Sequence, residues 1–141
     1  METHELYRIA QDSDTPVIIL DIPENGSMCI QTEIRCYIGM DYGVLVDEAD
    51  RRVHLGHELG HCQTGSFYNR YAARDVRQKH ENRADKWAIK KLVPKDELDT
   101  AVADGCTDMW SLAERFGVTE PFIRKAICLY THGNLATELY F

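Results

Sequence analysis

The chain has 141 residues, of which 44% are hydrophobic and 28% are charged, values that are ordinary for a soluble globular protein. The longest purely apolar run, Val17–Leu20, is too short to cross a membrane. The acidic start at residues 1–5 lacks the basic and apolar regions of a signal peptide. We therefore expect one cytoplasmic domain without a membrane partner.

The net charge of −7 is distributed unevenly along the chain. Residues 70–95 carry nine lysines and arginines against three acidic residues, a local charge of +6, so the remainder carries −13. A basic stretch can bind an acidic partner or nucleic acid, but lysines are also common on exposed helix faces. We interpret this stretch as a solvated helix face.

The five cysteines, at positions 29, 36, 62, 106 and 128, form no CxxC pair and are odd in number. This usage is typical of buried thiols in a reducing compartment rather than of a disulfide framework. Cys29 and Cys36 are close enough in sequence to face each other across a hairpin, but we expect both to be small apolar core residues.

The first part of the chain is predicted to form a short helix and then strands. Residues 3–11 have apolar side chains at helical spacing, and residues 15–23 are predicted to form a buried strand that ends at Pro23. Residues 27–41 are predicted to contain one or two strands with a single buried face. The apolar residues that carry this period of two are Met28, Ile30, Ile34, Cys36 and Ile38.

From residue 47 onward the pattern is helical. Asp47 can cap a helix that ends near Gly65, and a loop leads to a second helix over residues 75–93. A third helix is predicted over 96–103 and a final pair over 108–117 and 119–133, after which we expect the tail, 135–141, to pack on the domain.

The predicted fold class is α+β, with a small N-terminal antiparallel or mixed sheet followed by a helical portion. We expect a single domain over residues 1–141. Its three parts are an N-terminal helix and strands (1–46), metal-binding helices (47–94), and C-terminal helices with the tail (95–141).

Residues 54–65, HLGHELGHCQTG, contain three histidines and a glutamate within eight positions. In an α-helix, positions i and i+4 lie about 40° apart around the axis and ~6 Å along it, so His57 and His61 present both imidazoles to one point. Glu58 lies beside that point, where its carboxylate can bond to water. This is the HExxH motif, which supplies two metal ligands and a general base from one helical turn. We expect His54 to face solvent or to support the site.

A catalytic zinc site needs a third protein ligand and an open position for water. Glu81, twenty positions after His61 in the next predicted helix, can be that ligand. Asp85, one turn later on the same face, can accept the free N–H of a ligand histidine and fix its tautomer. We therefore predict one Zn²⁺ ion held by His57, His61 and Glu81. The same ligands permit Mn²⁺, although the affinity order favours zinc.

Together these motifs resemble those of the gluzincins, the thermolysin-like metallopeptidases, in which HExxH is followed by ExxxD. They are even more similar to those of the ImmA/IrrE family of small metallopeptidases, HELGH and ExxAxxFAxxLLxP. The matching stretches here are His57–His61 and Glu81–Pro94. The resemblance covers most of the chain, with Trp87 in place of the usual phenylalanine and Lys90–Lys91 where the family is more apolar.

The resemblance implies a zinc-dependent endopeptidase that cleaves a helix-turn-helix repressor, often one encoded nearby in a prophage or other mobile element. In this interpretation Glu58 is the catalytic base. No additional DNA-binding or sensor domain is evident, so we expect a minimal version of the family. Two alternatives remain open: a non-catalytic metal-containing module that binds and titrates a repressor, and a DNA-binding regulator. The sequence leaves the oligomeric state open.

Peptide hydrolysis also requires a donor, besides the metal, for the oxyanion of the tetrahedral intermediate. Tyr68 and Tyr71 lie in the loop between the two ligand helices and are both candidates. Thermolysin-like enzymes use a tyrosine from this general region. The sequence does not choose between the two.

Residues 111–127, SLAERFGVTEPFIRKAI, have the appearance of a helix-turn-helix with a second helix capped by Thr119. A DNA-reading unit is expected to be basic, yet residues 107–133 carry three basic and three acidic side chains. We therefore predict a pair of scaffold helices and do not expect nucleic acid as a partner.

Overall fold

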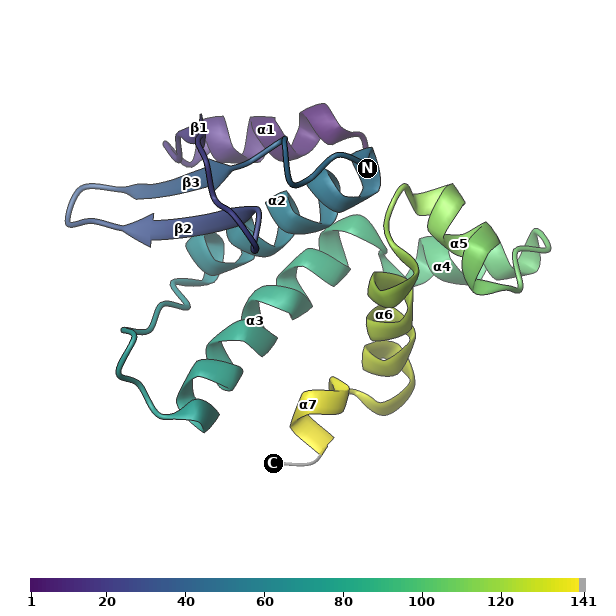
Figure 1. Ribbon diagram of the computed structural model, residues 1–141. Coiled ribbons are helices and arrows are strands. Elements are labelled where there is room, and N and C mark those ends of the chain that lie inside the picture. The colour runs from purple at the N-terminus through teal and green to yellow at the C-terminus, as the bar shows by residue number, and fades with distance from the viewer. Residues whose placement is uncertain (140–141) are drawn as a thin grey trace.

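The computed structural model describes residues 1–139 (Figure 1). A small sheet near the N-terminus is followed by helices through the rest of the described chain, which confirms the predicted α+β class. In chain order the elements are α1 (Thr3–Asp12), β1 (Val17–Ile19), β2 (Ser27–Gln31), β3 (Cys36–Met40), α2 (Glu48–Thr64), α3 (Arg74–Leu92), α4 (Lys95–Ala103), α5 (Met109–Phe116), α6 (Glu120–His132) and α7 (Ala136–Leu139).

The sheet is mixed and has the strand order β1-β3-β2. β1 runs parallel to β3, whereas β2 and β3 form an antiparallel hairpin. Ile38 and Met40 of β3 are completely buried and join Leu6 of α1 and Leu55 and Leu59 of α2 in one hydrophobic core. The sheet therefore lies against the helix that carries the HExxH motif, as Figure 1 also shows.

The prediction of one buried strand over residues 15–23 was wrong in both length and burial. β1 contains only three residues, and Ile19 is 59% exposed. β1 is an edge strand that pairs with β3 alone, so it has a partner on one side only. Beyond it, the amide of Ile22 donates to the Asp41 carboxylate instead of continuing the ladder.

The prediction that the even-numbered apolar residues of 27–41 share one buried face was correct for β3 and wrong for β2. The register pairs Cys29 with Ile38, so an odd-numbered residue of β2 lies opposite an even-numbered residue of β3 and points to the same face. Ser27 and Cys29 consequently face α2, while Met28 and Ile30 are exposed on the outer face. Across the hairpin turn, the buried face changes from the odd-numbered residues of β2 to the even-numbered residues of β3, and sequence periodicity alone does not reveal this change.

Helices α2 and α3 pack closely because two glycines of α2 face α3. A Cβ atom on Gly60 would meet the backbone of Ala84, with the Ala84 Cα only 2.9 Å away. One turn earlier, a Cβ atom on Gly56 would meet the Leu92 side chain, at 2.9 Å from its Cδ1. The missing side chains allow the two backbones to approach, and this approach brings the predicted third ligand helix against the HExxH helix.

A buried arginine connects the N-terminal helix to the C-terminal helices. Arg52 of α2 is 6% exposed, and its guanidinium donates to the Thr3 hydroxyl at 2.9 Å and to the Phe116 carbonyl at 3.1 Å. It also donates to the carbonyl of Met1. Several acceptors therefore compensate this buried cation, and they anchor α1 and α5 to α2.

The expectation that all cysteines are free thiols was wrong for one pair. A disulfide joins Cys36 of β3 to Cys62 of α2, with a Cα–Cα separation of 6.0 Å. Cys29, Cys106 and Cys128 are free and half-buried. Cys29 does not face Cys36, because the hairpin register places Gln31 opposite Cys36. The disulfide links the sheet to α2 at the residue after His61.

Both helices of the last pair have side-chain caps, of which the Thr119 cap was predicted from the sequence. The Asp108 carboxylate accepts from the Ser111 amide at 2.7 Å, and the Thr119 hydroxyl accepts from the Phe122 amide at 3.4 Å. The described part of the tail packs on the domain as predicted, and its partner is α3, where Glu138 forms an ion pair of 2.7 Å with Lys86. Residues 140–141 of the predicted tail lie outside the described residues.

The basic stretch of α3 has the exposed face that was predicted for it, with Arg83, Lys90 and Lys91 open to solvent. Within residues 1–139, no helix combines the length and the apolar character that crossing a membrane requires.

The contact of Gly60 with α3 leads to a test on two glycines of the same helix. Gly60→Ala should destabilise the fold by about 1–3 kcal/mol, because the added methyl group meets a backbone that cannot move aside. Gly56→Ala should cost much less, because a leucine side chain can rotate away and alanine gains about 1 kcal/mol in helix propensity. Urea unfolding followed by circular dichroism measures both. Equal stabilities of the two variants would contradict this account.

Candidate metal centre

Helix α2 presents His57 and His61 from successive turns, as the spacing of four requires. Their Nε2 atoms are 3.2 Å apart. For two histidine nitrogens about 2.05 Å from a tetrahedral zinc ion, a separation of about 3.3 Å is expected. The two imidazoles therefore converge at a distance that suits the ligands of a single ion.

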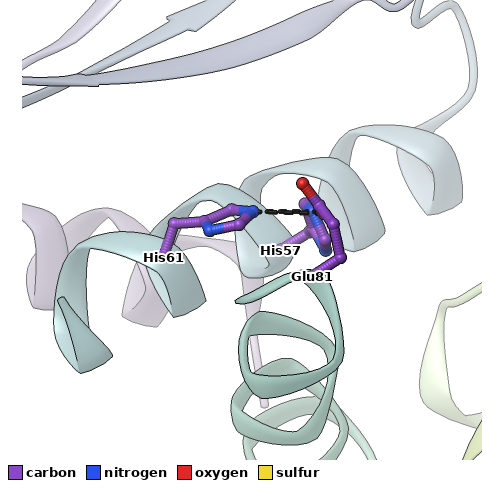
Figure 2. A group of neighbouring side chains, drawn as sticks. All are labelled: His57, His61 and Glu81. Atoms are coloured by element: carbon purple, nitrogen blue, oxygen red, sulfur yellow. Dashed lines mark hydrogen bonds and ion pairs between the residues drawn. The ribbon is translucent and has the colours of Figure 1, made fainter. Parts of the chain in front are cut away.

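Helix α3 brings a carboxylate to the same point. Glu81 Oε2 lies 2.7 Å from the His57 Nε2 and 3.2 Å from the His61 Nε2 (Figure 2). Among the described residues these three side chains form a cluster that could hold a metal ion, with one ligand atom from each lying within 4.8 Å of the others. The structure thus brings together the three residues that the sequence predicts as ligands.

The hydrogen bonds of the histidines determine which nitrogens carry protons. His57 Nδ1 lies 2.7 Å from the Asp85 carboxylate, and His61 Nδ1 lies 2.5 Å from the Ser66 carbonyl. Both partners accept only, so both Nδ1 atoms donate. In the neutral imidazoles, both Nε2 lone pairs then point at one another and at the Glu81 carboxylate. Such converging lone pairs repel unless a cation lies between them, so the donor set fits a divalent metal ion.

The same geometry holds a proton when no metal is bound. Burial opposes a charge on His57, but the hydrogen bonds to Asp85 and Glu81 outweigh it and raise the pKa of His57 to about 10. The pKa of His61 is also raised, since the carboxylate of Glu81 and the Ser66 carbonyl outweigh burial. Against the effect of burial, the two histidines lower the pKa of the Glu81 carboxyl.

The cluster lines a cleft of about 670 Å³ bounded by β2, α2, α3, α6 and the loop after α2. Glu58 also lines this cleft and is 7% exposed, but it is not one of the three residues whose ligand atoms converge. Its Oε2 accepts a hydrogen bond of 2.7 Å from the Ser27 hydroxyl. The carboxylate predicted to act as base is therefore held inside the cleft by the first residue of β2.

Of the two tyrosines, only Tyr68 reaches the site. Its hydroxyl donates to Glu81 Oε1 at 2.6 Å, and Tyr68 lines the cleft. Burial and the hydrogen bond to Glu81 raise the pKa of Tyr68 to about 12, so the phenol keeps its proton. Tyr71 is 79% exposed, accepts a hydrogen bond from Arg70 and is not among the cleft residues.

Several residues around the site were not predicted from the sequence. Lys125 of α6 forms an ion pair of 3.2 Å with Asp85, and Phe122 of the same helix lines the cleft. Cys29 of β2 lies beside Glu58, and burial together with the Glu58 and Glu81 carboxylates raises the pKa of its thiol. No sequence motif marks these residues, because they come from strands and helices far from the HExxH segment.

The fold and the site define a class of protein: a helix with HExxH, a second helix with the third ligand, and a small sheet over the cleft are typical of metallopeptidases. The family model described as the IrrE N-terminal-like domain, peptidase M78, matches residues 43–127. The chain belongs to this family, which confirms the resemblance seen in the sequence. No curated protein and no solved structure matches the chain.

The proton on His57 makes both stability and metal binding depend on pH. Its folded pKa of about 10 lies above its ordinary value of 6.5, so in the metal-free protein its stabilising effect is complete below pH 6.5. The effect is lost as the pH rises toward 10. Metal binding requires the neutral imidazole and therefore strengthens over the same interval.

We therefore expect the increase in Tm on adding one equivalent of zinc to be larger at pH 8.5 than at pH 6.5. Scanning calorimetry of chelator-treated and zinc-loaded protein measures this difference. His57→Asn is the control, and it should show little increase at either pH. An increase in the wild type that shrinks with rising pH would contradict the assignment.

Proposed function

We propose that this protein is a zinc-dependent endopeptidase whose metal ligands are His57, His61 and Glu81. The observation that carries the proposal is the position of Glu58, a buried carboxylate in the same cleft as three converging ligand atoms. A closed structural zinc site has four protein ligands and no need for a base. Here three ligands and a neighbouring carboxylate support hydrolysis. The histidine and carboxylate donors also permit manganese.

In the proposed reaction, a bound metal ion supplies Lewis-acid polarisation of the scissile carbonyl. Glu58 takes a proton from the attacking water and later delivers it to the leaving amine, acting first as a general base and then as a general acid. The Asp85 carboxylate accepts a hydrogen bond from the Nδ1–H of His57 and so keeps the Nε2 of His57 unprotonated for the metal. The backbone carbonyl of Ser66 has the same role for His61.

We propose Tyr68 rather than Tyr71 as the donor to the oxyanion, because only Tyr68 lines the cleft and keeps its phenolic proton there. Tyr68→Phe should reduce kcat by roughly 10²-fold, the effect of losing one such donor. Tyr71→Phe is the matched control and should retain full activity. Zinc affinity is measured in parallel, because Tyr68 also contacts Glu81. A loss of activity in Tyr71→Phe alone would reverse the assignment.

The substrate proposed from the family resemblance is a helix-turn-helix repressor encoded beside the peptidase in a prophage or other mobile element. Cleavage would relieve repression of neighbouring genes, which requires a cytoplasmic location. Cytosolic reductants keep most thiols reduced, so in that compartment Cys36 and Cys62 would be linked only under oxidising conditions. We further propose that the whole chain acts as one domain, with the C-terminal helices contributing to the cleft through Phe122 and Lys125.

The test is intact-mass spectrometry of that repressor after incubation with zinc- or manganese-loaded protein. The wild type should cleave one defined bond, and Glu58→Gln should cleave at least about 10²-fold more slowly, because it lacks the general base. Glu114→Gln, an exposed position on α5, is the control. Metal content of each variant is measured to show that Glu58→Gln still binds the ion.

Two other outcomes would favour the alternatives. A stable complex of the repressor with both wild type and Glu58→Gln, without cleavage, would favour a non-catalytic module that titrates the repressor. Binding to operon DNA at low salt would favour a DNA-binding regulator. That second alternative has little support, because two of the three basic side chains of the α5–α6 region form ion pairs. Arg115 pairs with Asp104, and Lys125 pairs with Asp85.

A further inference from the structure

Two residues outside the HExxH motif form a hydrogen-bonded chain that ends at Glu58. The Ser27 Oγ lies 2.7 Å from the Glu58 Oε2 and 2.7 Å from the His54 Nδ1. Ser27 is 8% exposed and begins β2, whereas His54 precedes Glu58 by one turn of α2. The serine therefore bridges two side chains on one face of the helix from the strand that lies over it.

The available protons determine which atom donates in each hydrogen bond between His54, Ser27 and Glu58. The Ser27 hydroxyl donates to the Glu58 carboxylate, so its single proton is used in that hydrogen bond. The Ser27 oxygen then has only lone pairs to offer His54, and His54 must donate from Nδ1. With Nδ1 protonated, a neutral imidazole has a bare Nε2. Burial lowers the pKa of His54, which supports the neutral form.

We propose that Ser27 and His54 are positioning residues for Glu58. The inference rests on the proposed peptidase function, and it concerns two residues outside the HExxH motif, of which Ser27 also lies outside the residues that the family model matches. Ser27 holds Oε2 and thereby fixes the orientation of the Glu58 carboxylate in the cleft. His54 holds the serine hydroxyl in the rotamer that donates to Glu58. A carboxylate held in one orientation populates the productive conformation more fully, and this raises kcat rather than substrate affinity.

The hydrogen-bonded chain can be tested without any substrate. In ¹⁵N-labelled, zinc-loaded protein, long-range ¹H–¹⁵N correlation spectra distinguish the two neutral imidazole tautomers, and His54→Asn assigns the signal. His54 should show the Nδ1–H tautomer in the wild type and lose that preference in Ser27→Ala. Detection of the Nε2–H tautomer in the wild type would overturn the inference, whether or not the protein cleaves its substrate.

The positioning role is tested by steady-state kinetics on a peptide substrate that contains the bond of the repressor that the wild type cleaves. Ser27→Ala and His54→Leu should lower kcat by about 10–100-fold, the usual effect of removing an outer hydrogen-bond partner, and leave KM and zinc affinity unchanged. Ser27→Thr keeps the hydroxyl and His54→Asn keeps a donor near the Nδ1 position, so both should restore most of kcat. Ser111→Ala and His132→Asn are remote controls that should match the wild type.

The outcomes separate the two proposals. Unchanged kcat in Ser27→Ala, or a loss of zinc affinity equal to the loss of kcat, would overturn the positioning role while leaving the peptidase intact. If the wild type cleaves nothing but His54 retains the Nδ1–H tautomer that depends on Ser27, the hydrogen-bonded chain is supported and the proposed function alone fails.

Discussion

The close approach of α3 to α2 at Gly60 is the constraint on which the candidate metal centre depends. His57 and His61 belong to one helix and converge by helical geometry alone. Glu81 belongs to another helix, and its carboxylate reaches the two imidazoles only because the Ala84 backbone lies where a side chain of residue 60 would otherwise be. Gly60 lies between His57 and His61. The HExxH segment therefore itself contains the residue that allows α3 to approach α2.

The two histidines of the candidate metal centre are held by hydrogen-bond acceptors that belong to different parts of the chain. Asp85 holds His57, and the Ser66 carbonyl in the loop after α2 holds His61. Asp85 in turn pairs with Lys125 of α6. The C-terminal helices thus contact the site through an ion pair, which explains why a region with the pattern of a DNA-binding motif can have a structural purpose in a metallopeptidase fold. Arg52 connects the same helices to the N-terminus.

The sheet contributes to the cleft because the hairpin register decides which side chains of β2 face α2. Because Cys29 lies opposite Ile38, the small polar residues of β2 face α2 and the large apolar residues face outward. A register shifted by one residue would have turned Met28 and Ile30 toward α2 and removed the Ser27 contact with Glu58. The disulfide between Cys36 and Cys62 links this strand pair to α2 close to the site.

The sequence by itself determined the helices, the α+β class, the family and the cluster of His57, His61 and Glu81. These follow from local periodicity and from motif spacing, in which each residue limits the position of the next along one helix or between two neighbouring helices. The burial of the strands, the disulfide, the position of Tyr68 rather than Tyr71 in the cleft, and the contacts of Ser27, His54 and Lys125 were decided only by the tertiary structure. They depend on strand register, on which loop residue turns inward, and on contacts between residues as many as 40 positions apart, as for Asp85 and Lys125, and no local pattern encodes such contacts.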